Sequence, residues 1–84
     1  MFEIIKANVT PQQAKAIYPD NWVVLLVKKA EGNEDEDLFG DIVFVGNEDE
    51  ISPFTKGKIP QTGYMFYRLR GNNLRELTAI EVVA

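Results

Sequence analysis

The chain has 84 residues, of which 45% are hydrophobic, and its 13 acidic and 9 basic residues give a net charge of −4. This length supports one hydrophobic core, so residues 1–84 are expected to form a single domain. Because the chain contains neither cysteine nor histidine, disulfides, zinc sites built on these residues and catalytic triads that need them are excluded. The negative charge also disfavours nucleic acid as a partner, because its phosphates are repelled.

The N-terminal sequence does not have the features of a signal peptide, because Glu3 comes early and no long apolar region follows. No apolar run approaches the roughly 20 residues that a membrane-spanning helix needs. Small secreted domains usually depend on disulfides, and this chain has none. We therefore expect a cytoplasmic protein without a membrane partner.

A strand and a short helix are the first predicted elements. Residues 2–7 have apolar side chains on both alternating faces, which is typical of an edge strand. Thr10 is expected to cap the following helix, and Gln13 to complete a capping box. The helix should extend from Pro11 to Tyr18, because Pro19 disfavours helical geometry at the residue before it.

The longest apolar run, residues 21–27, predicts the central strand and contains Trp22, the sole tryptophan. A run without polar alternation cannot show a polar face to water, so the strand is expected to be covered on both faces. Periodicity alone would also permit a buried helix segment. The valine content and the turn residues on either side favour the strand.

Residues 31–37 form an acidic segment, and their like charges predict a solvated hairpin loop. Asp35, Asp37 and Gly40 match the first, third and sixth positions of an EF-hand calcium loop. The twelfth position, which requires a bidentate glutamate, is Gly46. We assign no metal site, and the sequence leaves open whether the segment binds an ion.

The middle of the chain predicts a second strand, a turn of helix and a loop. Residues 41–45 are apolar and should pair antiparallel with the central strand. A helix is predicted to start after Asn47, its N-cap, with Pro53 limiting it to about one turn. Residues 54–62 are predicted to form a loop.

Residues 63–70 predict a third strand, whose side chains alternate between two faces. One face holds Met65, Tyr67 and Leu69. The other face holds Tyr64, Phe66, Arg68 and Arg70. Gly71 to Asn73 should break the strand, and residues 77–83 predict a last strand, with a helix over residues 74–77 as an alternative.

The motifs YPDNWVVL at residues 18–25, GDIV at 40–43 and GYMFY at 63–67 follow one another in this order. This order resembles certain small uncharacterised prokaryotic domains, in which a short helix leads into a Tyr-x-x-x-Trp-Val strand, a glycine-led strand, a helical piece and an aromatic strand. The acidic segment and the proline in the middle helix depart from that pattern. The resemblance implies an α+β topology and no activity.

We therefore expect an α+β domain with a mainly antiparallel sheet of four or five strands. The helix from Pro11 to Tyr18 should pack on one face. A carboxylate pair for acid–base catalysis would have to come from Asp41, Glu50 and Glu81, with one of them buried and its pKa displaced. Acidic residues at strand ends and helix starts more often cap or face solvent, so we expect no enzyme, no catalytic residue and no cofactor.

The aromatic and basic face of the third strand is the predicted interaction site. Tyr64, Phe66, Arg68 and Arg70 form it. The leading hypothesis is a non-catalytic interaction or regulatory module. The alternative is a ligand or single-stranded nucleic-acid binder that uses Tyr64, Phe66 and Arg68, since exposed rings on a strand stack on bases in sheet-type RNA binders.

The sequence also predicts a homodimer. The strands are apolar on both faces, but only one good helix is available to cover them. The face expected to lack a cover carries Tyr64, Phe66 and parts of Leu25 or Phe44. Such an apolar patch generally marks an interface, and a twofold dimer is the commonest way to bury it. Arg68 and Arg70 would then face residues 34–37 of the partner.

Overall fold

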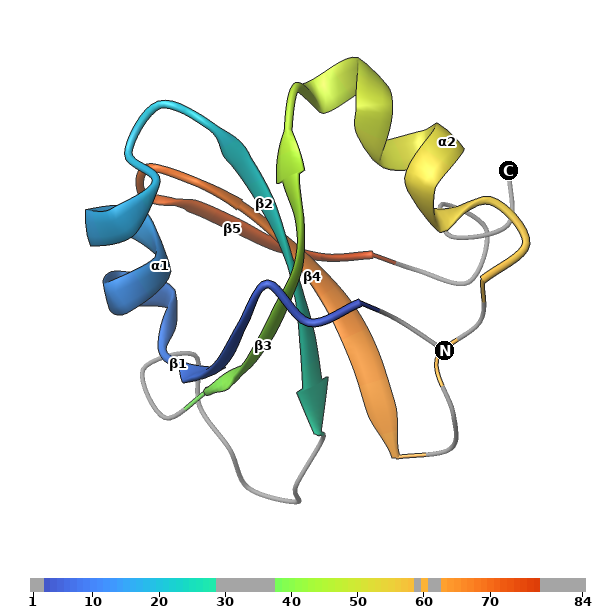
Figure 1. The fold of residues 1–84 in the computed structure, drawn as a ribbon, viewed down its shortest axis with the longest axis horizontal. Helices are drawn as coiled ribbons and strands as arrows, with labels where there is room; N and C mark the ends of the chain where they lie inside the picture. Colours follow the sequence, from blue (N-terminus) through green and yellow to red (C-terminus); the bar gives the residue numbers. More distant parts are fainter. Residues whose placement is uncertain (1–2, 29–37, 59, 61–62, 78–84) are drawn as a thin grey trace.

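The computed structural model describes residues 3–28, 38–58, 60 and 63–77. These residues form a five-stranded antiparallel sheet with two short helices, which is the expected α+β fold (Figure 1). The strands are β1 (Lys6–Val9), β2 (Trp22–Lys28), β3 (Gly40–Gly46), β4 (Tyr64–Arg70) and β5 (Asn73–Leu77). The helices are α1 (Pro11–Ile17) and α2 (Ile51–Thr55), and a 3-10 turn, η2 (Glu48–Glu50), leads into α2. Neither of these helices is long and apolar enough to cross a membrane.

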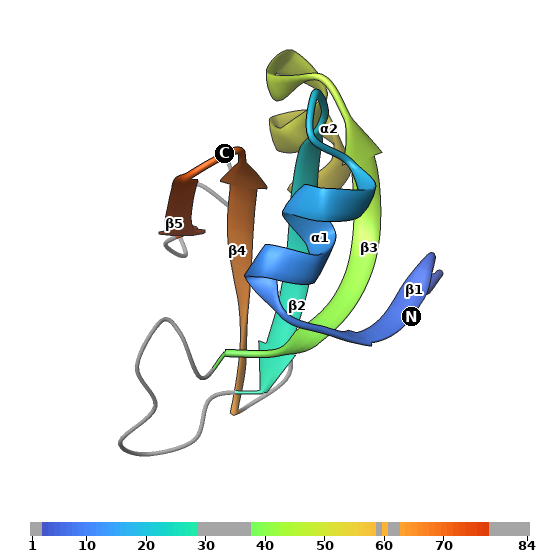
Figure 2. The same cartoon turned by 90° about the vertical axis from the view of Figure 1, so that its left-hand side faces the viewer.

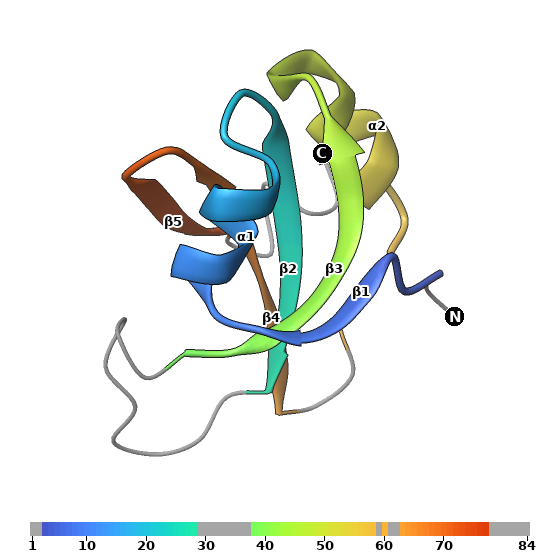
Figure 3. The ribbon, with the colours of Figure 1, turned by 60° about the vertical axis from the view of Figure 1, so that its left-hand side comes forward.

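The strand order is β1-β3-β2-β4-β5, so β2 lies in the centre, as its unbroken apolar run predicted. Figures 2 and 3 show α1 in front of the sheet and α2 behind it. The side chains of Val23 and Leu25 point to the α1 face, and those of Trp22 and Val24 point to the α2 face. All four are buried, because each face of β2 has its own hydrophobic core.

Helix α1 begins with the capping box that the sequence predicted. The Gln13 N–H donates to Thr10 Oγ1 at 3.1 Å, and the Thr10 N–H donates to Gln13 Oε1 at 2.9 Å. Ala14 is the buried residue of the helix and packs into the α1-side core. So short a helix is marginal in isolation, so the cap and this contact hold it in place.

Strand β1 lies at a sheet edge, as predicted, but its position was predicted incorrectly. It covers Lys6–Val9 rather than residues 2–7. Its pairing with β3 shifts register between Lys6 and Val9. Within this shift Asn8 has a positive φ of 57°, and its N–H donates to Asp41 Oδ1 at 3.1 Å. Asparagine tolerates this conformation better than most residues. The carboxylate that accepts its N–H belongs to the neighbouring strand β3, which is distant in sequence.

Helix α2 corrects the prediction for the middle of the chain, because Pro53 lies inside it and residues 54 and 55 are helical rather than loop. Pro53 occupies the third position of α2, where the backbone N–H has no partner within the helix, so proline does not interrupt it. The preceding turn η2 has Asn47 as its N-cap, as predicted, and the Asn47 N–H donates to Glu50 Oε1 at 3.0 Å.

Strands β4 and β5 form a tight hairpin in which Arg70 pairs with Asn73. The last strand therefore begins earlier than predicted, and the alternative of a helix over residues 74–77 is wrong. Residues 78–83 of the predicted strand lie outside the described part of the chain. Gly71, the first of the two turn residues, has a φ of 57°, which suits a type II′ turn and favours glycine.

Candidate functional site

The predicted site residues of β4 share the α2 face of the sheet, but they differ in exposure. Phe66 is fully buried in the α2-side core. Tyr64 and Arg68 are half-buried, and Arg70 is exposed. Phe66 therefore cannot present its ring to a base or to a partner protein in this conformation.

The residues of the apolar face predicted to form a homodimer do not all lie on one face of the sheet. Leu25 pairs with Tyr67 and lies on the α1 face, opposite to Phe66. Phe44 does lie on the α2 face, where its ring centroid is 4.9 Å from that of Phe54 in α2. Leu25 and Phe66 are both 0% exposed, so neither contributes an exposed apolar patch. The oligomeric state itself stays a prediction.

Three arginines gather on the α2 face of the β4–β5 hairpin. Arg68 lies directly opposite Arg75, and Arg70 lies opposite Asn73. Because residues opposite each other and residues two apart point to the same side, Arg68, Arg70 and Arg75 share one face. We call these three residues the arginine face. Like charges directly opposite each other disfavour a strand pair, so the Arg68–Arg75 arrangement is unusual.

Arg68 contacts one acidic and one aromatic side chain. Its Nη1 lies 3.5 Å from Glu48 Oε1, and its Cζ lies 5.4 Å from the centroid of the Trp22 ring. The Glu48 side chain is 63% exposed, so this ion pair is solvent-screened and contributes little to stability. A carboxylate from another molecule can therefore replace Glu48 at small cost.

Two buried donors near this contact lack an acceptor. They are Trp22 Nε1 and Arg68 Nε. Both groups only donate hydrogen bonds, so they cannot satisfy each other. Buried donors are nearly always paired in proteins, and an unpaired one costs roughly 1–3 kcal/mol. Both nitrogen atoms are buried, so a ligand at the surface cannot reach them in this conformation.

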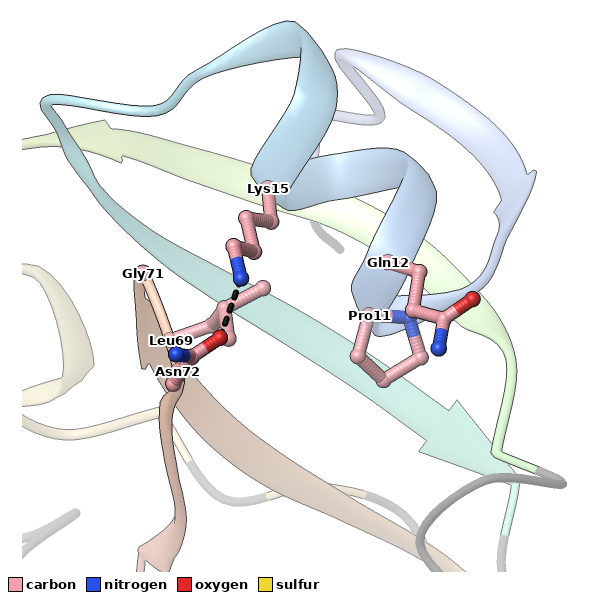
Figure 4. Close-up of a pocket in the computed structure, with 6 residues that line it drawn as sticks. All are labelled: Pro11, Gln12, Lys15, Leu69, Gly71 and Asn72. Atoms are coloured by element: carbon pink, nitrogen blue, oxygen red, sulfur yellow. Dashed lines mark hydrogen bonds between the residues drawn. The ribbon is translucent and has the colours of Figure 1, made fainter.

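A pocket of about 200 Å³ lies on the other side of the hairpin, between α1 and the β4–β5 turn (Figure 4). Its lining consists of Pro11, Gln12, Lys15, Leu69, Gly71 and Asn72. The ammonium group of Lys15 points across it and donates a hydrogen bond to Asn72 Oδ1. The pocket is smaller than the ~300 Å³ at which ligand pockets usually begin, and its cation is already engaged. We interpret it as the joint between the helix and the hairpin.

The carboxylates considered for catalysis have structural roles where the structure describes them. Asp41 accepts the N–H of Asn8, and Glu50 accepts the N–H of Asn47. Glu81 and the acidic segment 31–37 lie outside the described residues. Among the residues described, no group of three acidic side chains is placed to hold a metal ion.

Arg75 is the site residue that sequence reasoning missed. The last strand was predicted to begin at residue 77, which left Arg75 without a strand partner. The signal that would have found it is the two-residue turn after Arg70, since a hairpin closed there sets Arg75 opposite Arg68.

Comparisons of the chain with protein-family models, with curated proteins and with solved structures found no match. The resemblance to small prokaryotic domains therefore stays a prediction. What the protein binds has to be argued from its own surface.

Proposed function

We propose that this protein is a non-catalytic interaction module that binds an acidic segment of a partner protein through the arginine face. The observation that carries the proposal is the placement of Arg68 opposite Arg75, with Arg70 on the same side. A guanidinium group matches a carboxylate in two parallel hydrogen bonds, so such a cluster suits glutamate and aspartate side chains.

The charge distribution supports an acidic partner. The chain as a whole has a net charge of −4, yet the arginine face concentrates positive charge on one side of one hairpin. A local patch of opposite sign attracts an acidic segment in one orientation and sets specificity more than affinity.

A protein partner suits this site better than single-stranded nucleic acid. Base stacking needs exposed rings, and Phe66, the central ring of the strand, is fully buried. A phosphate backbone would also run along the acidic remainder of the surface. A short carboxylate-bearing segment would contact the arginine face alone. A cysteine-free chain of this kind is suited to the reducing cytoplasm.

The proposal is tested with a glutamate-rich peptide and its glutamine counterpart. Trp22, the sole tryptophan, lies beside Arg68 and serves as an intrinsic fluorescent probe. We expect the glutamate peptide to change the fluorescence saturably and to bind less tightly as salt is added, whereas the glutamine peptide has no effect.

A matched pair of double variants localises the binding. Replacing Arg70 and Arg75 by glutamine should weaken the glutamate peptide about tenfold, which corresponds to about 1.4 kcal/mol. Replacing Lys6 and Lys28 by glutamine removes the same charge from exposed positions outside the arginine face. If this second variant weakens binding as much as the first, the arginine face is not the site.

A further inference from the structure

We infer that the carboxylate-bearing segment of the partner protein binds as an additional strand along the outer edge of β5. This inference rests on the proposed function and names its binding mode. β5 is at one end of the strand order and, among the described strands, pairs with β4 only. Figure 3 shows it on the side of the sheet away from β1. An edge strand offers backbone donors and acceptors to an incoming extended segment, and such strand addition is a common mode of peptide recognition.

The hairpin geometry identifies which backbone groups are offered. Arg70 and Asn73 flank a two-residue turn, and in such hairpins these flanking residues exchange backbone hydrogen bonds. The direction of the backbone groups then alternates along the strand. The N–H and C=O of Leu74 and Glu76 consequently point away from β4, toward an incoming strand.

The side chains of β5 specify what the incoming strand should carry. Arg75 belongs to the arginine face, so the residue opposite it should be aspartate or glutamate, which also lies on the side of Arg68. The two neighbouring residues point to the α1 face, opposite Leu74 and Glu76. Leu74 packs against the α1-side core and favours an apolar partner, whereas Glu76 favours a basic one. An antiparallel segment would therefore read basic, acidic, apolar from its N-terminus.

A second copy of β5 does not meet this requirement. The order Arg75, Glu76, Leu77 occurs in β5 itself. However, two identical sheets joined antiparallel at this edge keep the same faces together, so Arg75 cannot lie opposite Glu76 of the other copy. Twofold pairing centred on either residue sets like charges directly opposite each other. No other part of the sequence has a basic, an acidic and an apolar residue in this order, so the occupant is a segment of another protein.

Backbone methylation of a peptide that contains the basic, acidic, apolar order tests strand addition separately from charge. In the predicted register, the N–H groups of the basic and the apolar residue point to β5, and that of the acidic residue points away. A peptide methylated at the backbone nitrogens of the basic and the apolar residue should lose at least about tenfold in affinity, about 1.4 kcal/mol. A peptide methylated only at the acidic residue carries the same charges and should retain its affinity.

Hydrogen exchange of the protein amides gives a second readout. With the unmodified peptide bound, the amides of Leu74 and Glu76 should exchange more slowly, whereas that of Arg75 should change little. Equal affinity of all methylated peptides would overturn strand addition and leave the acidic-partner proposal standing. If only the glutamate-rich peptide binds, strand addition in this register fails and the acidic-partner proposal stands. If neither that peptide nor the unmodified peptide binds, the proposed function itself fails. A dimer of the free protein that the peptide dissociates would overturn the exclusion of a second copy.

Discussion

The two faces of the sheet are built from different chemistry. On the α1 face, apolar side chains such as Leu25 and Leu69 pack under a helix whose first turn is closed by a capping box. The α2 face also has an apolar core, but aromatic rings and cations surround it, and Arg68 lies over Trp22. Among the described residues, both buried donors without an acceptor belong to the α2 face. Arg70 and Arg75, which are exposed, lie on the α2 face as well, so we assign folding to the α1 face and binding mainly to the α2 face.

The largest effect is expected where the α2 face is itself core. Phe66→Glu should abolish the folded state, because truncating a buried phenylalanine alone costs about 3–5 kcal/mol and the buried charge adds to this. Phe39→Glu is the control, since that ring is 59% exposed. Circular dichroism of both variants decides the matter. A folded Phe66→Glu monomer would place this ring in an interface instead of the core.

A core substitution on the other face should separate stability from binding. Leu25→Ala should lower the free energy of unfolding by about 2–5 kcal/mol, because it leaves a cavity under α1. The folded fraction should still bind the glutamate peptide with unchanged affinity. Urea unfolding measures the first quantity and Trp22 fluorescence the second. A large loss of affinity in the folded protein would contradict the assignment of binding to the α2 face.

The capping box of α1 should have a smaller, purely structural effect. Thr10→Ala removes the acceptor of the Gln13 N–H and should destabilise the protein by about 0.5–2 kcal/mol. Gln12→Ala changes an exposed residue of the same helix that takes no part in the cap. We expect the melting temperature to fall for the first variant and to stay nearly constant for the second. Equal melting temperatures would mean that the cap contributes nothing.

The smallest effect on stability, but a clear one on binding, is expected at Glu48. Glu48→Gln removes the carboxylate beside Arg68 and should change the free energy of unfolding by less than about 1 kcal/mol. The glutamate peptide should bind several-fold more tightly, because it no longer competes with Glu48. Asp49→Asn makes the same charge change one residue away. If both variants bind the peptide equally, only net charge matters and the Glu48–Arg68 pair does not.

Local chemistry made most of the sheet and α1 predictable. The apolar run of β2, the cap at Thr10 and the alternation in β4 each follow from neighbouring residues, and all three occur in the structure. The irregularity of β1 was not predictable in this way, because it depends on Asp41, which is distant in sequence from Asn8. Pro53 was misjudged because its effect depends on where the helix begins.

The candidate site was only partly predictable, because it depends on strand register. The sequence placed Arg68 and Arg70 on one face correctly, since alternation within a strand is local. It could not show that Arg75 lies opposite Arg68, because Asn73 and its polar neighbours have low strand propensity and the hairpin turn decides their pairing. The prediction that Leu25 shares a face with Phe66 was wrong because it also depended on strand register. In the β2–β4 pairing, Leu25 lies opposite Tyr67, so it points to the other face of the sheet from Phe66.

The irregular backbone at Asn8 limits how many partners one copy of the chain can hold. If both outer strands accepted a neighbour, complexes could join edge to edge into an ever-growing sheet. At β1 the register shift and the positive φ of Asn8 interrupt the straight ladder that a further strand would need. Assembly can then proceed at β5 alone, so we expect a closed complex with one partner per chain instead of a fibre.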